Sequence, residues 1–181
     1  MSVSLRRYTV DQVDAFPEDG NRYELLDGIL FVTPAPLPAH EALVFRLCLR
    51  LGVHLQAWPD VHVAGQSEVV ARPRHKLQPD LQVYRADRIP PSWAAVQERW
   101  LAVEVASPTT RRYDRAYKLD AYLALGVREV WLVDPATRSV TVGREGSVPM
   151  DVTGDLIWTP PPPAPPLRID LGHLFADLPP A

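Results

Sequence analysis

Cysteine is almost absent from this chain of 181 residues, because Cys48 is the only one. A single cysteine excludes a disulfide within the chain and any cysteine-rich zinc site, and it is typical of proteins in a reducing cytoplasm. Lysine is also scarce, since Lys76 and Lys118 are the only lysines among 19 basic residues. In so arginine-rich a chain, a lysine within a helical pattern indicates a need for a compact ammonium group at Lys118.

Long apolar runs are missing as well. No run approaches the roughly 20 residues of a membrane span, and no apolar stretch follows the Arg6-Arg7 pair as a signal peptide would require. We therefore expect a cytoplasmic protein with no membrane partner. The composition, 46% hydrophobic and 23% charged, is ordinary for a globular protein, and the length suits one core. We predict a single domain over residues 1–181.

An excess of positive charge is absent too, because the formal net charge is −3. This value argues weakly against a surface coated with basic patches for nucleic acid. Two local basic clusters, within residues 72–76 and 111–115, would nevertheless suit a phosphate backbone as partner. Solvated loop charges are the simpler interpretation of each residue taken alone.

The apolar pattern predicts an α/β fold. A short helix over residues 8–19 precedes a hairpin of 23–26 and 29–32, joined by Asp27-Gly28. Two longer helices are expected, at 39–58 and 112–125. Further strands are expected at 61–70, 79–84, 100–106, 128–133 and 139–143. This order predicts a sandwich with a central mixed β-sheet flanked by helices.

Proline accumulates near the C-terminus. Residues 159–166 predict an extended polyproline segment, followed by a strand-like piece and a short amphipathic helix within 167–178. A proline-rich linker is the common meaning of such a run, and an interaction module recognised by an aromatic groove is the alternative.

Two carboxylates stand where the pattern predicts buried strands. Asp80 follows Pro79 and opens one apolar strand, and Glu104 interrupts another at 100–106. A carboxylate there is costly unless a metal ion or a cation compensates it, and a bound divalent ion would keep it ionised. Two such acids followed by a lysine are the minimum set for a Mg²⁺-dependent phosphodiester hydrolase. A helix N-cap or an arginine partner for each acid is the structural alternative.

The expected helix 112–125 carries Asp114 and Lys118 four residues apart, on a face shared with Tyr122. A surface ion pair is the simpler interpretation of this spacing. Tyr122 indicates that the face is partly buried, so that Lys118 would reach back over the end of the Glu104 strand toward a scissile phosphate.

These residues belong to a longer pattern. It comprises Tyr23 to Gly28, Pro79-Asp80, Val103 to Thr109, the positions Asp114, Lys118 and Tyr122, and Gly126 to Asp134. In the order and spacing of these pieces the chain resembles, over residues 8 to 176, the Uma-two family of restriction endonucleases within the PD-(D/E)XK nuclease superfamily. The resemblance implies a restriction-endonuclease-like core.

The resemblance also implies a site. Asp80 and Glu104 would bind Mg²⁺, for which Mn²⁺ is a possible substitute, assisted by a main-chain carbonyl near Val105. The lysine of the superfamily pattern would stand two residues after Glu104, where this chain has Ala106. The resemblance to the family implies that a lysine on the next helix, Lys118 here, takes its place.

A second departure lies after the Asp-Gly turn, where the family often has an acid and this chain has Ile29. Glu24 is then the only acid upstream of Asp80 that remains for the site in this resemblance, and it would hold a second ion or anchor the water shell of the first. We take Asp80, Glu104, Lys118 and Glu24 as the catalytic set.

We therefore predict a Mg²⁺-dependent endonuclease of nucleic acid, with DNA as the favoured substrate. The ion would polarise a phosphoryl oxygen and acidify a bound water, and Lys118 would orient that water or neutralise the developing charge. A homodimer is expected, because a domain of this size cuts a duplex most simply as a pair. His40 is either a site contact or a structural histidine. The alternative is a nuclease-fold protein that binds nucleic acid or a protein without cutting, which the near-neutral charge and Ile29 favour.

Overall fold

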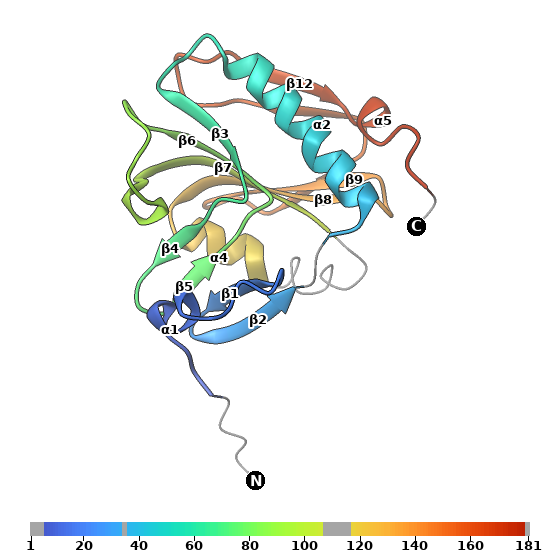
Figure 1. Cartoon of the computed structure of the whole chain (residues 1–181). Helices are drawn as coiled ribbons and strands as arrows, with labels where there is room; N and C mark the ends of the chain where they lie inside the picture. The colour runs from blue at the N-terminus through green and yellow to red at the C-terminus, as the bar shows by residue number, and fades with distance from the viewer. Residues whose placement is uncertain (1–5, 34–35, 107–116, 180–181) are drawn as a thin grey trace.

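The structure is a computed structural model that describes residues 6–33, 36–106 and 117–179 (Figure 1). Its main feature is a six-stranded sheet with the order β10-β9-β8-β7-β6-β3. These strands are β3 (Val61–Gly65), β6 (Leu81–Arg85), β7 (Glu98–Val105), β8 (Val127–Asp134), β9 (Ser139–Arg144) and β10 (Met150–Val152). β7 and β8 run parallel, and the other neighbouring strands run antiparallel, so the predicted mixed sheet is confirmed.

A smaller antiparallel sheet has the order β2-β1-β5-β4. Its strands are β1 (Arg22–Leu26), β2 (Ile29–Thr33), β4 (Val69–Ala71) and β5 (His75–Leu77). Asp27 and Gly28 join β1 to β2 with φ values of 48° and 77°. Positive φ at both central residues is what a two-residue hairpin turn of this kind needs, which is why Asp-Gly predicts it correctly.

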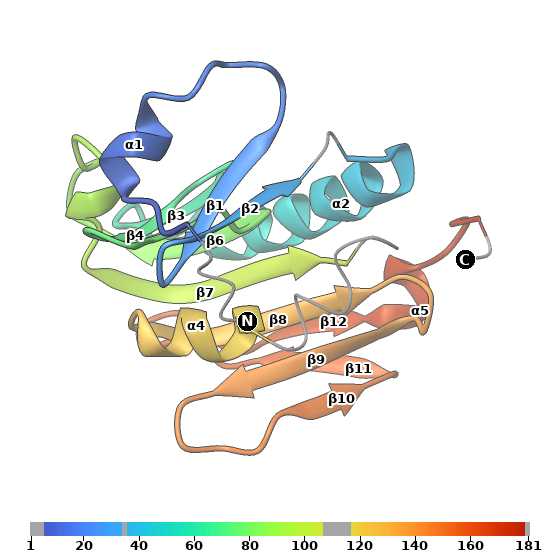
Figure 2. The same ribbon diagram turned by 90° about the horizontal axis from the view of Figure 1, so that it is seen from below.

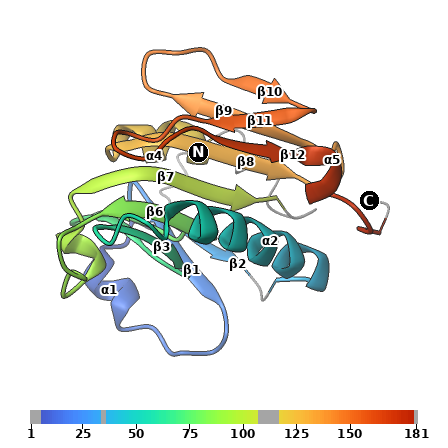
Figure 3. The same ribbon diagram turned by 90° about the horizontal axis from the view of Figure 1, so that it is seen from above.

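Helices and the small sheet cover the two faces of the large sheet (Figures 1 and 3). α2 (Pro38–Leu55) packs the leucines Leu43, Leu47, Leu51 and Leu55 on one face. α4 (Leu119–Ala124) and the small sheet pack on the other. The remaining helices of the described residues are α1 (Val10–Asp14), the 3₁₀ turn η1 (Trp93–Ala95) and α5 (Leu171–Leu174). Within the described ranges, no helix has the length and apolar character needed to cross a membrane.

β7 carries a different side-chain set on each face. Leu101, Val103 and Val105 belong to the core beneath α2, whereas Ala102 belongs to the core beneath α4. Since side chains alternate along a strand, Glu104 points to the α4 side. α4 and the small sheet lie on this side of the large sheet (Figure 2), so Glu104 is held between the two layers.

Local expectations were wrong at several places around the small sheet. The predicted strand over 61–70 is two strands, separated at Gln66, which has a φ of 50°. β5 lies where a solvated basic cluster was expected. Lys76 in β5 is buried and forms ion pairs with Asp14 and Glu68, 2.8 and 2.9 Å away, so it is not part of an exposed cationic rim.

The proline-rich segment does not form the predicted extended run. It connects β11 (Asp155–Trp158) to β12 (Leu167–Asp170), which pair antiparallel, and it contains a turn at residues 161–164. Ala164 is buried in the core beneath α2, and the Pro165 carbonyl lies 2.8 Å from His54 Nε2. The segment thus packs on the molecule rather than forming a free linker.

Gly143 in β9 sets how closely α4 lies against the sheet. A Cβ atom at this position would come 2.7–2.8 Å from the buried side chain of Leu119. We expect Gly143→Ala to lower the unfolding free energy by about 1–3 kcal/mol, because the buried Leu119 side chain would have to shift to admit the methyl group. Gly52 in α2 is the matched control, since a Cβ there meets nothing within 4 Å. Gly52→Ala should raise stability by about 0.5–1 kcal/mol. Urea denaturation measures both, and equal effects would contradict this packing.

Candidate active site

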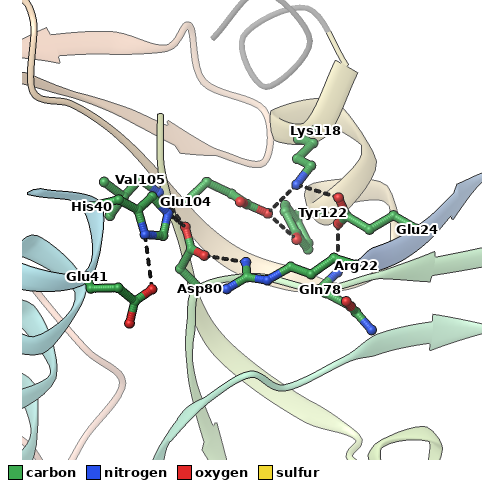
Figure 4. A network of polar contacts seen from close by, with 10 residues as sticks. All are labelled: Arg22, Glu24, His40, Glu41, Gln78, Asp80, Glu104, Val105, Lys118 and Tyr122. Atoms are coloured by element: carbon green, nitrogen blue, oxygen red, sulfur yellow. Dashed lines mark hydrogen bonds and ion pairs between the residues drawn. The ribbon is translucent and has the colours of Figure 1, made fainter. Parts of the chain in front are cut away.

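Two buried acids lie at neighbouring ends of β6 and β7, Asp80 pointing to His40 and Arg22 and Glu104 to Lys118 and Tyr122 (Figure 4). Leu81, the first residue of β6, pairs with Val103 of β7 in antiparallel register. The next pair of positions along the two chains is therefore Asp80 and Glu104, whose backbones lie opposite each other. The two residues are 3% and 4% exposed. The Val105 N–H donates a hydrogen bond of 2.8 Å to Asp80 Oδ2, which ties the start of β6 to the end of β7.

Asp80 is held by two basic side chains as well. Arg22 Nη1 lies 2.6 Å from its Oδ1, and His40 Nε2 lies 3.0 Å from its Oδ2. Burial by itself raises the pKa of the Asp80 carboxyl, but the contacts with His40, Arg22 and the Val105 N–H outweigh burial and lower it. Asp80 is therefore a buried carboxylate in its ionised form.

His40 lies in the first turn of α2 and links that helix to the acids. Burial alone lowers the pKa of its imidazole, but the hydrogen bond and the negative charge of Asp80 raise it above the ordinary value of 6.5. Glu41 adds a smaller effect in the same direction, with an oxygen 3.4 Å from His40 Nδ1. Arg22 opposes it.

This geometry predicts a pH-dependent stability. Because the folded-state pKa of His40 is raised above 6.5, its contribution is complete below that value and is lost as the pH rises through the folded-state pKa. We expect the wild type to lose unfolding free energy relative to His40→Gln as the pH rises from about 6 to 8. Urea denaturation across this range measures the difference, and parallel curves for the two proteins would contradict it.

Glu104 belongs to a second cluster. Lys118 Nζ lies 2.9 Å from Glu104 Oε1 and 2.9 Å from Glu24 Oε2, while the Tyr122 hydroxyl donates a bond of 2.5 Å to Glu104 Oε1. Lys118 caps the start of α4 and Tyr122 follows one turn later, so both side chains reach the site from the same face. The Gln78 N–H donates to Glu24 Oε1 at 2.8 Å.

Tyr122 remains a hydrogen-bond donor at any ordinary pH. Burial, followed by the negative charges of Glu104 and Glu24, raises the pKa of its phenol well above the usual 10.0. Its hydroxyl therefore orients Glu104 without competing for a proton.

β1 supplies two of the charged residues from the opposite layer. Arg22 and Glu24 are two positions apart in the strand, so they project to the same side, toward the large sheet. Leu25, the next residue of β1, projects to the other side and packs against α1. The site thus lies where the small sheet, the large sheet, α2 and α4 converge (Figure 4).

The structure brings together the four side chains that the sequence nominated: Glu24, Asp80, Glu104 and Lys118. Val105 contributes its main-chain N–H to Asp80. Asp114 and the basic cluster at 111–115 lie outside the described residues. Arg22 was missed, although its position two residues before Glu24 in a predicted hairpin strand was a usable signal.

The donor set fits a Mg²⁺ ion bound in the usual way. No group of three or more His, Cys, Asp or Glu side chains in the described ranges is arranged to hold a metal. Mg²⁺, however, keeps several waters and is commonly held by one or two carboxylates together with substrate phosphates. Asp80 and Glu104 are two buried carboxylates on adjacent strands, which is the donor type that such an ion uses, and each is paired with a cation in this structure.

The sequence was also compared with models of known protein families. A family model described as "Uma2: Putative restriction endonuclease" matches residues 10–172. This chain belongs to the Uma2 family. The resemblance noted in the sequence is thereby confirmed, and a search of curated proteins gave no match.

The fold of this Uma2 protein is shared with a solved structure. That structure is described as a putative nuclease belonging to DUF820 from Anabaena variabilis ATCC 29413, with a TM-score of 0.77 over 93% of this chain and 97% of that chain. The sequence identity is 19%, so this likeness shows the fold alone. The predicted α/β class with a nuclease-like core is confirmed by it.

Proposed function

We propose that this Uma2 protein is a metal-dependent endonuclease that hydrolyses phosphodiester bonds of nucleic acid, with DNA as substrate. The observation that supports this most strongly is a pair of buried acids on adjacent strands, Asp80 and Glu104, with Lys118 Nζ 2.9 Å from the second. Family membership and the nuclease-like fold support the same reaction class.

Each residue has a definable task in this proposal. A bound Mg²⁺ or Mn²⁺ ion supplies Lewis acidity at a phosphoryl oxygen. Asp80 and Glu104 would hold the ion, and Lys118 would offset the negative charge that develops on the phosphate. Glu24 has one oxygen on Lys118 and the other on the Gln78 N–H, which favours positioning of the lysine over capture of a second ion.

The direct test is incubation of pure protein with supercoiled plasmid and with labelled DNA and RNA oligonucleotides. We expect cleavage of DNA with Mg²⁺ or Mn²⁺ and none with EDTA. Binding without cleavage in every metal would instead support the non-catalytic alternative, a nuclease-fold protein that holds nucleic acid or a protein partner.

We also propose that the protein acts as a homodimer, because the two strands of a duplex are cut most simply by a symmetric pair of sites. Analytical ultracentrifugation with and without a DNA duplex measures this. A monomer in both conditions would overturn the dimer and leave the chemistry untouched.

A further inference from the structure

Arg22 is bound to an acid that the proposed reaction needs for its metal ion. Its Nη1 lies 2.6 Å from Asp80 Oδ1, and Glu104 and Glu24 add to the negative potential around it. Burial alone lowers the pKa of Arg22, yet these carboxylates raise it overall, so the guanidinium stays charged. A metal ion that takes Asp80 therefore competes with a permanent cation.

Charge balance indicates what happens in that competition. The charged side chains of the site within the described ranges are the acids Glu24, Glu41, Asp80 and Glu104 and the bases Arg22, His40 and Lys118. Arg22 and Lys118 each contact one of the two acids that would hold the ion. A divalent ion would add two positive charges beside these cations, which is unfavourable unless a cation leaves or an anion enters.

Exposure distinguishes which cation is able to leave. The side chain of Arg22 is 25% exposed, compared with 10% for His40 and 5% for Lys118. Arg22 enters the site from the first residue of β1, so its guanidinium can turn toward solvent without unfolding a strand or a helix. A guanidinium binds carboxylate and phosphate with the same fork of N–H donors.

We propose that Arg22 is a resident counter-ion of Asp80 that a divalent metal ion displaces, and that the released guanidinium then binds a phosphate of the nucleic acid substrate. The inference rests on the proposed function. It assigns Arg22 two successive partners, a carboxylate before metal binding and a phosphate after it. Removal of the charge should therefore strengthen metal binding and weaken substrate binding.

Calorimetric titration of Mn²⁺ into the wild type, Arg22→Gln and Arg22→Lys tests the first half. We expect about tenfold tighter binding for Arg22→Gln, because a positive charge beside the ion is gone, and near wild-type binding for Arg22→Lys. Arg85→Gln is the matched control. Arg85 ends the same strand that Asp80 precedes and pairs with Asp60 at 2.7 Å, so this variant changes the net charge equally. It should bind Mn²⁺ like the wild type.

Two further readouts complete the test. In the wild type, the Nε–H NMR signal of Arg22, assigned by its absence from Arg22→Lys, should shift on addition of Mg²⁺ while that of Arg85 stays. This measurement does not depend on the folding of Arg22→Gln. In cleavage assays at saturating Mg²⁺, Arg22→Gln should raise KM for an oligonucleotide about tenfold, since a charge-assisted phosphate contact is lost, with a smaller effect on kcat.

The outcomes separate this inference from the proposed function. Displacement of Arg22 by the metal ion is overturned, even if the enzyme cleaves, by either of two results. One is Mn²⁺ binding by Arg22→Gln that is equal to or weaker than that of the wild type, and the other is an Arg22 Nε–H signal that does not shift when Mg²⁺ is added. An unchanged KM overturns the phosphate contact. If the wild type binds no Mn²⁺, or if Asp80→Asn leaves its Mn²⁺ binding unchanged, the metal site on which both proposals depend is overturned instead.

Discussion

Replacement of Glu104 by glutamine is expected to lower Mg²⁺-dependent cleavage at least about a thousandfold, since Lewis-acid stabilisation by a metal ion is worth several kcal/mol. Glutamine keeps the volume of the side chain and can still accept from Lys118 and Tyr122, which now hold the carboxylate at 2.9 and 2.5 Å. The loss should therefore arise from a missing ionic ligand and not from unfolding. Plasmid cleavage rates, with circular dichroism as a folding check, measure it.

The same strand offers a matched control. Glu98 begins β7 and accepts hydrogen bonds from Arg128 and the Trp100 indole at 2.7 and 3.0 Å, away from the site. Glu98→Gln removes an equal charge and should cleave at the wild-type rate. If Glu104→Gln retained more than a tenth of the activity, Glu104 would not be a metal ligand.

Replacement of Lys118 by methionine should have the largest effect on stability. The ammonium group lies between Glu24 and Glu104, both nearly inaccessible to solvent, so its loss leaves two buried carboxylates without this partner. Breaking a buried pair in this way costs about 3–5 kcal/mol. We expect a loss of that size in urea denaturation at neutral pH, together with loss of cleavage.

A double variant tests the cause of this loss. Glu24→Gln added to Lys118→Met removes one of the two carboxylate charges that Lys118 had balanced and should recover part of the stability, which a double-mutant cycle reports as coupling between the two sites. Arg128→Met is the control. It breaks a solvent-exposed pair with Glu98 and should cost no more than about 1 kcal/mol. A Lys118 loss as small as the Arg128 loss would contradict the buried bridge.

The sequence was informative where the signal is local. An acid inside an apolar strand indicates without coordinates that Glu104 is buried and needs a partner, as it also does for Glu129 in β8, which Arg144 holds at 2.8 Å. Lys118 and Tyr122 are one helical turn apart, and Asp27-Gly28 specifies its own turn. These positions needed no long-range information.

The long-range contacts were not predictable in the same way. Arg22 and Asp80 are separated by 58 residues, and nothing in either local pattern reveals that two sheets bring them together. The short strands β5 and β10 carry too few residues to show an alternation. Lys76 was misassigned for this reason, since only the packing of β5 against α1 and β4 explains its burial with Asp14 and Glu68.

The most direct test of the site is anomalous diffraction from a crystal of the wild-type protein soaked in Mn²⁺. We expect one strong peak between the carboxylates of Asp80 and Glu104, with oxygens of both at about 2.0–2.2 Å, and the Arg22 guanidinium moved off Asp80 Oδ1. A fully occupied Mn²⁺ site elsewhere, with the 2.6 Å contact between Arg22 and Asp80 still intact, would contradict a metal ion shared by the two acids.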